Sequence, residues 1–324
     1  MAVTTDPIAA ADVVGFIPER WPGMINKALF AKATAANFFT DLSAFAQGGG
    51  DIFHVPDVYT NLLGSTGGTA DSQSTEGAEI TTATGAQNDV TLTVNTHKYL
   101  AFIIGSKDMV QLATQYDFNT VYTDQAAGLL RKALEADIYG LWSGLSTNSA
   151  GDTATVLSDA EVRNAIYLLE NGNFNTLEGD VAWHIHPYTW YLQLGAIAKY
   201  YDQSQRGPLS AAGFAATGLL GEADIARGRK GTIYGIPAYV STNVVSGLQT
   251  YRNLLAHKSA LGFATQYLST PGSMSMEAGR VRADSGWERR NIGYLTVVDM
   301  IYGVAELRDA AAVVVNGSSA FLGS

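Results

Sequence analysis

The chain has 324 residues, a formal net charge of −10, no cysteine and only 15% charged residues. Typical globular domains carry about 25% charged residues, and the wet surface of a free monomer needs them. The acidic balance excludes a dedicated reader of nucleic acid, which needs a basic footprint against phosphates. The lack of cysteine excludes disulfides and thiolate metal sites and fits a reducing cytosol. We infer that other copies of the chain cover much of its exterior.

The N-terminal stretch, "MAVTTDPIAAADVVGF", lacks the basic region and apolar core of a secretion signal. No uninterrupted apolar run approaches the ~20 residues that a membrane span needs. Neither observation favours an exported or membrane-bound protein.

The first third of the chain predicts a helix, a strand and a long polar arm. The segment "PERWPGMINKALFAKATAANFF" has helical spacing, and Gly48–Gly50 breaks that helix. A short strand is expected at Asp51–Val58. The following stretch consists almost entirely of Gly, Ala, Ser, Thr, Asn and Gln. Its only charges are Asp71, Glu76 and Glu79.

A second strand is expected where the chain returns from the arm, over Asp89–Gly105. Val90, Leu92 and Val94 alternate with threonines, which is typical of a strand with one buried face. The denser apolar run Tyr99–Ile104 predicts a strand that is buried on both faces.

The clearest helix is expected at Phe118–Gly144, long enough to span most of the subunit. Its apolar stripe comprises Ala126, Leu130, Leu134, Ile138 and Trp142, widened by Leu129, Ala133 and Leu141. Glu135 and Asp137 are interpreted as a solvated or interface edge of this helix.

The rest of the chain predicts a mixed α/β region followed by strands. Ser158 with Glu161 forms a capping box for a helix, and Val181–His186 reads as a strand. A helix starts at Pro187, and Gly231–Val244 predicts two short strands joined by a turn. Three further strands are expected in the tail, in "SMSMEAGRVRA", "IGYLTVVDMIYGVAEL" and "DAAAVVVNG".

Motifs for catalysis are missing. The chain has no G-x-S-x-G elbow, no phosphate-binding glycine loop and no cysteine nucleophile. His184 and His186 stand two residues apart on a predicted strand, which puts both on one face as some metal sites require. Neighbouring Trp183, Ile185 and Trp190 favour packing instead. We therefore expect no enzyme, no metal and no cofactor, and keep a metal-dependent hydrolase as an alternative.

The segment "WERRN" gathers Trp287, Glu288, Arg289 and Arg290. Tryptophan and arginine are frequent anchors of protein interfaces, so these four residues are candidate intersubunit contacts. The alternative is an ordinary charged turn. The acidic residues of the polar arm are candidate contacts too, because a two-stranded ribbon is marginal in water without a partner surface. We expect the arm to lie over a neighbouring copy.

The order of these elements resembles the major capsid (coat) protein of tailed bacteriophages. Phrases of the type "YGIP-x-YVS", "LLAHKSAL" and "YGVA-x-LR-x-x-A" carry the resemblance, which extends over nearly the whole chain. It implies an α+β fold with four parts. They are an N-terminal arm (1–47), an extended loop (48–98), a peripheral domain with a long spine helix (99–150 and 273–306) and an axial domain (151–272 and 307–324).

The resemblance also implies the function: many copies, as hexamers and pentamers, close into an icosahedral shell around packaged double-stranded DNA. Implied partners are a portal, a separate scaffolding protein, since Met1 stands directly at the arm, and an accessory cement protein. The implied location is the virion, after assembly in the host cytoplasm. An acidic wall agrees with this role because it does not hold DNA tightly. An encapsulin-type compartment, which shares the fold, and a surface lattice remain alternatives.

We predict shells without covalent links between subunits. Some relatives weld neighbours through a lysine of the extended loop, whereas Tyr59–Gln87 contains no lysine here. Purified particles boiled in detergent should therefore run as single chains in gel electrophoresis. A ladder of multimers would contradict the prediction.

Overall fold

The computed structural model describes residues 33–46, 50–57, 88–111, 118–176, 179–194, 197, 229–244, 250–268, 274–276 and 280–318. The helical elements are α1 (Ala35–Phe38), α2 (Ser43–Ala46), α3 (Ser106–Gln111), α4 (Phe118–Gly140), η3 (Leu141–Ser143), α5 (Asp159–Asn171), η4 (Thr189–Gln193) and η9 (Asp309–Ala311). The strands are β1 (Thr40–Asp41), β2 (Ile52–Asp57), β3 (Asn88–Thr93), β4 (Thr96–Gly105), β5 (Ser149–Ala150), β6 (Val181–Ile185), β7 (Arg229–Ile233), β8 (Ile236–Val240), β9 (Thr250–His257), β10 (Leu261–Gln266), β11 (Met274–Met276), β12 (Val281–Glu288), β13 (Gly293–Glu306) and β14 (Ala312–Ser318).

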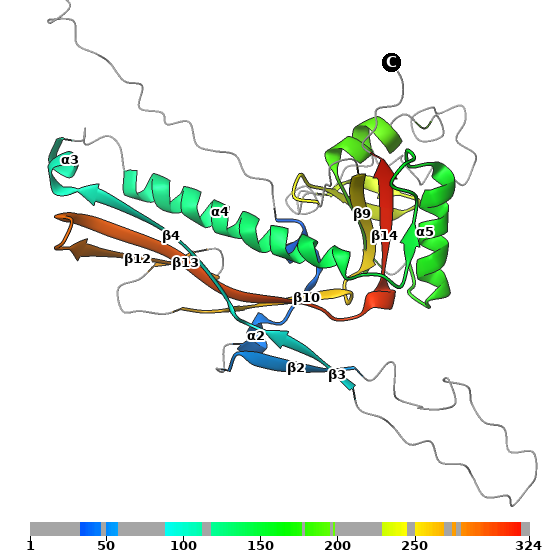
Figure 1. Cartoon of the computed structure of the whole chain (residues 1–324), viewed down its shortest axis with the longest axis horizontal. Coiled ribbons are helices and arrows are strands. Elements are labelled where there is room, and N and C mark those ends of the chain that lie inside the picture. The colour runs from blue at the N-terminus through cyan, green and yellow to red at the C-terminus, as the bar shows by residue number, and fades with distance from the viewer. Residues whose placement is uncertain are drawn as a thin grey trace, which may run out of the picture.

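The long strand β13 organises the larger sheet. Along one edge it pairs antiparallel with β4, from Gly293 opposite Gly105 to Tyr302 opposite Thr96. Along its other edge it pairs first with β12 and then with β10. Strands β1 and β11 complete the sheet at β10 and β12. Figure 1 shows the resulting elongated body, with α4 running along it.

Helix α4 covers one face of this sheet, which we name the helix face. The predicted stripe is buried, with Ala126, Leu130, Leu134 and Ile138, and Trp142 of η3 ends it. Val298, which lies opposite Leu100 in the sheet, is buried as well. Lys98 of β4 donates a hydrogen bond of 2.7 Å to the Asp137 carboxylate of α4, and Tyr302 of β13 donates to the same oxygen. These hydrogen bonds therefore supplement the apolar contact between α4 and the sheet.

A second sheet builds the axial part of the molecule, in the order β5-β14-β9-β6-β8-β7. Helix α5 packs against β14, β5 and β9, and its buried side chains are Val162, Ala165 and Leu169. The predicted capping box at its start is present: the Glu161 backbone N–H donates to Ser158 Oγ, and the Ser158 N–H donates to the Glu161 carboxylate. In Figure 1 this part lies at the far end of α4.

The described base of the extended loop is the two-stranded ribbon of β2 and β3. Its apolar face packs on this chain's own body, because Leu92 and Val94 are buried with Ala46 and Ala264. The ribbon lies across the sheet from α4 (Figure 1). The expectation that the ribbon depends on a neighbour for cover is therefore wrong for its base, whereas residues 58–87 lie outside the described residues.

The α+β fold class is confirmed, but three details of the sequence analysis are wrong. The run Tyr99–Ile104 is covered on one face only, since its side chains alternate between exposed and half-buried. The reason is that α4 covers just the helix face. Leu129 of the predicted stripe is exposed, and Glu135, expected at a solvated edge, is 1% exposed.

The domain limits stay a prediction. Strand β10, which the prediction assigned to the axial part, pairs with β13 in the larger sheet. The turn at Lys258–Ala260 thus carries the chain from one sheet to the other. Within the described part of the chain, no helix is both long and apolar enough to cross a membrane.

Gly303→Ala should destabilise the protein strongly. A Cβ at Gly303 would lie 2.2 Å from the Thr93 carbonyl oxygen, so the ribbon would have to move away from β13. Overpacking of this kind costs about 1–3 kcal/mol, and we expect the upper half of that range in urea denaturation. Gly286→Ala in β12 is the matched control, because its Cβ would meet no atom within 4 Å. Equal stability of the two variants would contradict the close docking of the ribbon.

Candidate assembly surface

The face of the larger sheet opposite α4, which we name the open face, carries apolar side chains that are exposed or half-buried. Pairing places Ile103 opposite Leu295 and Ala101 opposite Val297, with Tyr99 two residues further along β4. Tyr99 is 68% and Ile103 is 41% exposed. The base of the ribbon covers this face only near the C-terminal half of β13.

A depression of about 310 Å³ lies on the open face and is lined by Arg282, Asp284, Gly286, Trp287, Glu288, Leu295 and Val297. Its lining mixes apolar side chains with both signs of charge. That mixture is typical of protein interfaces, which combine apolar anchors with a polar rim. Exposed apolar patches with a polar rim are a common feature of surfaces that contact other proteins.

A buried carboxylate ties three strands together on the open face. Asp299 of β13 is 2% exposed and accepts hydrogen bonds from Arg282 of β12 at 2.9 and 2.6 Å. His97 Nε2 of β4 lies 3.0 Å from the same carboxylate. Burial raises the pKa of Asp299, but the hydrogen bonds and charges of Arg282 and His97 outweigh it, so the pKa is lowered overall.

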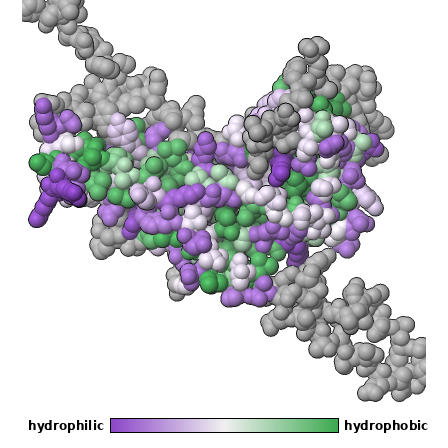
Figure 2. All heavy atoms as spheres, in the orientation of Figure 1, coloured by the Kyte–Doolittle hydropathy of each residue, from purple (hydrophilic) through white to green (hydrophobic). Residues whose placement is uncertain are grey.

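The tip of the larger sheet is the β12–β13 turn, and it presents the predicted contact residues. Trp287 is 49% exposed and makes an edge-to-face contact with Tyr294, at 5.6 Å between ring centres. Arg289 and Arg290 are exposed, and the Glu288 carboxylate accepts a 3.0 Å hydrogen bond from the Arg290 backbone N–H. Figure 2 shows hydrophobic and strongly hydrophilic residues side by side at this end of the molecule.

The structure brings Trp287, Glu288, Arg289 and Arg290 together in one exposed turn. The other three candidate contacts, Asp71, Glu76 and Glu79, lie outside the described residues.

His184 and His186 both lie among packed aromatic rings. His184 is fully buried, stacks on Phe39 and Tyr239, and burial lowers its pKa to about 3. His186 stacks on Tyr251 at 4.2 Å between ring centres. Among the described residues, no cluster of three or more His, Cys, Asp or Glu side chains is placed to hold a metal ion. The two rings are packing residues, as their aromatic neighbours in the sequence indicated.

Sequence reasoning missed the polar groups that hold this surface in place. Asp299 is separated from Arg282 by 17 residues and from His97 by 202. The alternation of β13 offered one signal, because an aspartate within an apolar strand needs a cation on a neighbouring strand.

Comparisons with known proteins place the fold. Neither protein-family models nor curated protein sequences match the chain. Solved structures do match it over nearly its whole length. A chain from Mycobacterium phage Che8 has a TM-score of 0.64 and 17% identity, covering 93% of this chain and 97% of that one. The capsid of Ralstonia phage GP4 has a TM-score of 0.64 and 14% identity, covering 99% and 100%.

A third match is the capsid structure of cyanophage P-SCSP1u, with a TM-score of 0.63 and 14% identity, covering 94% of this chain and 93% of that one. The chain therefore has the fold of phage capsid structures. The likeness spans the larger sheet with its helix, the ribbon and the axial sheet together, which agrees with the resemblance noted in the sequence.

Asp299→Asn should lower the free energy of unfolding by about 2 kcal/mol at neutral pH, because the amide removes the charge opposite Arg282 and His97. A carboxyl whose folded pKa is lowered contributes stability above its unfolded pKa, about 3.9, and loses it as the pH falls further. The difference between wild type and variant should thus shrink below about pH 4.

Urea denaturation from pH 7 down to pH 3 measures this difference. Asp284→Asn on the same face is the control and should cost less, because Asp284 is less buried than Asp299. A wild-type advantage that stays constant down to pH 3 would contradict the ionic role of Asp299.

Proposed function

We propose that the chain is the major capsid subunit of a tailed bacteriophage and that many copies of it form an icosahedral shell around packaged double-stranded DNA. The observation that carries this proposal is the whole-chain likeness to phage capsid structures, with TM-scores of 0.64 over 93% and 99% of this chain. The low charge content and the open face support it, since both suit a subunit with neighbours on several sides. In this proposal the chain is structural and has no enzymatic role.

The tip residues Trp287, Glu288, Arg289 and Arg290 are proposed contacts between subunits. They are exposed or half-buried, and Trp287 also lines the depression on the open face. A flat aromatic ring beside two guanidinium groups supplies both apolar area and bidentate hydrogen bonding to a neighbour's carboxylates. Asp71, Glu76 and Glu79 of the extended loop are proposed as acidic contacts on a neighbouring copy.

The proposed partners follow from a closed DNA-filled shell. Hexamers and pentamers of the chain would make up its walls, with a portal at one vertex, a separate scaffolding protein during assembly and a cement protein on the outside. The net charge of −10 supports a wall that contains DNA without binding it tightly. The proposed location is the virion, with assembly in the host cytoplasm.

Particle formation and particle contents test the function. The chain, expressed with the neighbouring genes of its source, should give closed icosahedral particles in negative-stain electron microscopy, and their extract should contain DNA. Particles that contain a protein cargo and no DNA would favour an encapsulin-type compartment. A chain that forms no particles at all would contradict the shell function.

Replacing both arginines of the tip should block assembly without harming the fold. In the double variant Arg289→Glu and Arg290→Glu, like charges would face the carboxylates of a neighbour, which costs binding energy at an interface. Sedimentation should show subunits instead of shells, with an unchanged melting temperature. Lys132→Glu on the exposed side of α4 reverses a charge away from the tip and is the control. Shells of normal yield from the double variant would overturn this role of the tip.

A further inference from the structure

A buried carboxylate receives the end of the N-terminal arm. Glu135, in the C-terminal third of α4, accepts hydrogen bonds from three successive backbone N–H groups, those of Thr34 at 3.2 Å, Ala35 at 3.0 Å and Ala36 at 2.8 Å. The glutamate is 1% exposed. Its partners stand about a hundred residues earlier in the chain, so the contact joins the arm to the spine helix and is no local feature.

The same arm segment also reaches the axial sheet. Phe39 stacks on His184 of β6, with 5.1 Å between ring centres and 18° between ring planes, and Phe38 meets the same ring edge-on. The Thr34 hydroxyl hydrogen-bonds the Tyr139 hydroxyl of α4. The Tyr139 hydroxyl lies 3.4 Å from Nδ1 of His184. The helix, the arm and the axial sheet are thus connected by a row of hydrogen-bonding side chains.

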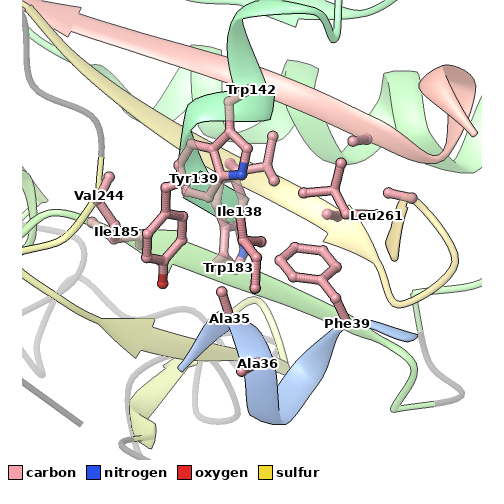
Figure 3. Close-up of a cluster of buried hydrophobic side chains, with 14 of the residues drawn as sticks. Ala35, Ala36, Phe39, Ile138, Tyr139, Trp142, Trp183, Ile185, Val244 and Leu261 are labelled. Atoms are coloured by element: carbon pink, nitrogen blue, oxygen red, sulfur yellow. The ribbon is translucent and has the colours of Figure 1, made fainter. Parts of the chain in front are cut away.

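Figure 3 shows this meeting point as a single buried cluster. Ala35, Ala36 and Phe39 come from the arm, Ile138, Tyr139 and Trp142 from the end of the spine helix, and Trp183 and Ile185 from the axial sheet. Ala35 is fully buried and Phe39 is 4% exposed. The arm residues thus fill core space between the other two parts.

Docking of the arm is energetically coupled to the contact between the spine helix and the axial sheet, which we name the junction. A buried carboxylate is costly unless it is hydrogen-bonded. Burial raises the pKa of Glu135 overall, although the N–H groups of Ala36, Ala35 and Thr34 and the charge of Arg131 act to lower it. Without the arm, Glu135 would lose its three donors, and the junction would have to open to let water reach the carboxylate.

We propose that residues 33–39 are a strap that locks the spine helix to the axial sheet, and that Glu135 is the positioning residue on which the lock depends. The strap sets the angle between the two parts of the subunit. Release of the strap would let that angle vary. This inference concerns a single copy of the chain and does not rest on the proposed shell function.

A distance measurement between the two parts tests the strap. The chain contains no cysteine, so Lys132→Cys on α4 and Asn164→Cys on α5 introduce spin labels at two exposed positions only. Labelled chains are diluted in excess unlabelled chain, so that only distances within one copy are read. The label pair should give a narrow distance distribution in the wild-type background and a clearly broader one with Glu135→Ala.

Hydrogen exchange on the same variants shows whether the strap itself is released. With Glu135→Ala, the amides of Thr34, Ala35 and Ala36 should exchange about tenfold faster or more. Glu135→Gln keeps one carbonyl acceptor and should give intermediate exchange and broadening. Asp124→Ala removes an exposed carboxylate from the same helix and should change neither quantity.

Faster exchange of the strap with an unchanged distance distribution would overturn the proposal, because the strap would then not set the angle between the two parts. Unchanged exchange in both Glu135 variants would also overturn it. If Glu135→Ala does not fold, as judged by circular dichroism, the comparison of Glu135→Gln with wild type decides by the same criteria. Particle formation does not enter any of these outcomes.

Discussion

The described part of the chain covers the helix face of its larger sheet but only one end of the open face, and this constraint shapes the rest of the molecule. Helix α4 packs on the helix face, whereas the ribbon base covers just one end of the open face. Tyr99, Ile103, Leu295 and Val297 are left on the other end. A sheet with an apolar open face needs a second layer, and no described part of this chain provides it there. In the proposed shell, a second copy supplies that layer.

The polar groups of the sheet fit the same constraint. Asp299 lies on the open face with Arg282 and His97, and Asp137 of α4 meets Lys98 and Tyr302 on the helix face. Each carboxylate joins neighbouring elements and stays solvated or paired before any neighbour arrives. These contacts hold the strands of the open face together within one copy of the chain.

The periodicity of apolar residues revealed the elements that pack against a single layer on one side. The stripe of α4 and the capping box at Ser158 could be predicted because their signals are local and repeat along the chain. The alternation of Val90, Leu92 and Val94 likewise identified the buried side of β3. The hydrophobic run Tyr99–Ile104 misled, because a dense apolar strand has the same sequence whether its second face is covered by its own chain or by another.

Long-range polar contacts could not be predicted for a different reason. Nothing near Glu135 in the sequence shows that backbone groups of the arm will meet it, so a buried anchor looked like an edge charge. The turn at Lys258–Ala260 posed a similar problem. The apolar segment around it contributes β9 to the axial sheet and β10 to the larger sheet. Trp287 and its charged neighbours were singled out as candidate contacts because they stand out in a chain with so few charges, and that role stays a prediction.

Hydroxyl-radical footprinting of free subunits and of assembled particles tests the central claim most directly. The account predicts that Tyr99 and Ile103 react readily in the free subunit and become protected on assembly. Tyr167, which is 62% exposed on the outer side of α5, provides a comparison within the same chain. If Tyr99 and Ile103 remained as reactive in particles as in free subunits, no neighbour would cover the open face, and the account would be wrong.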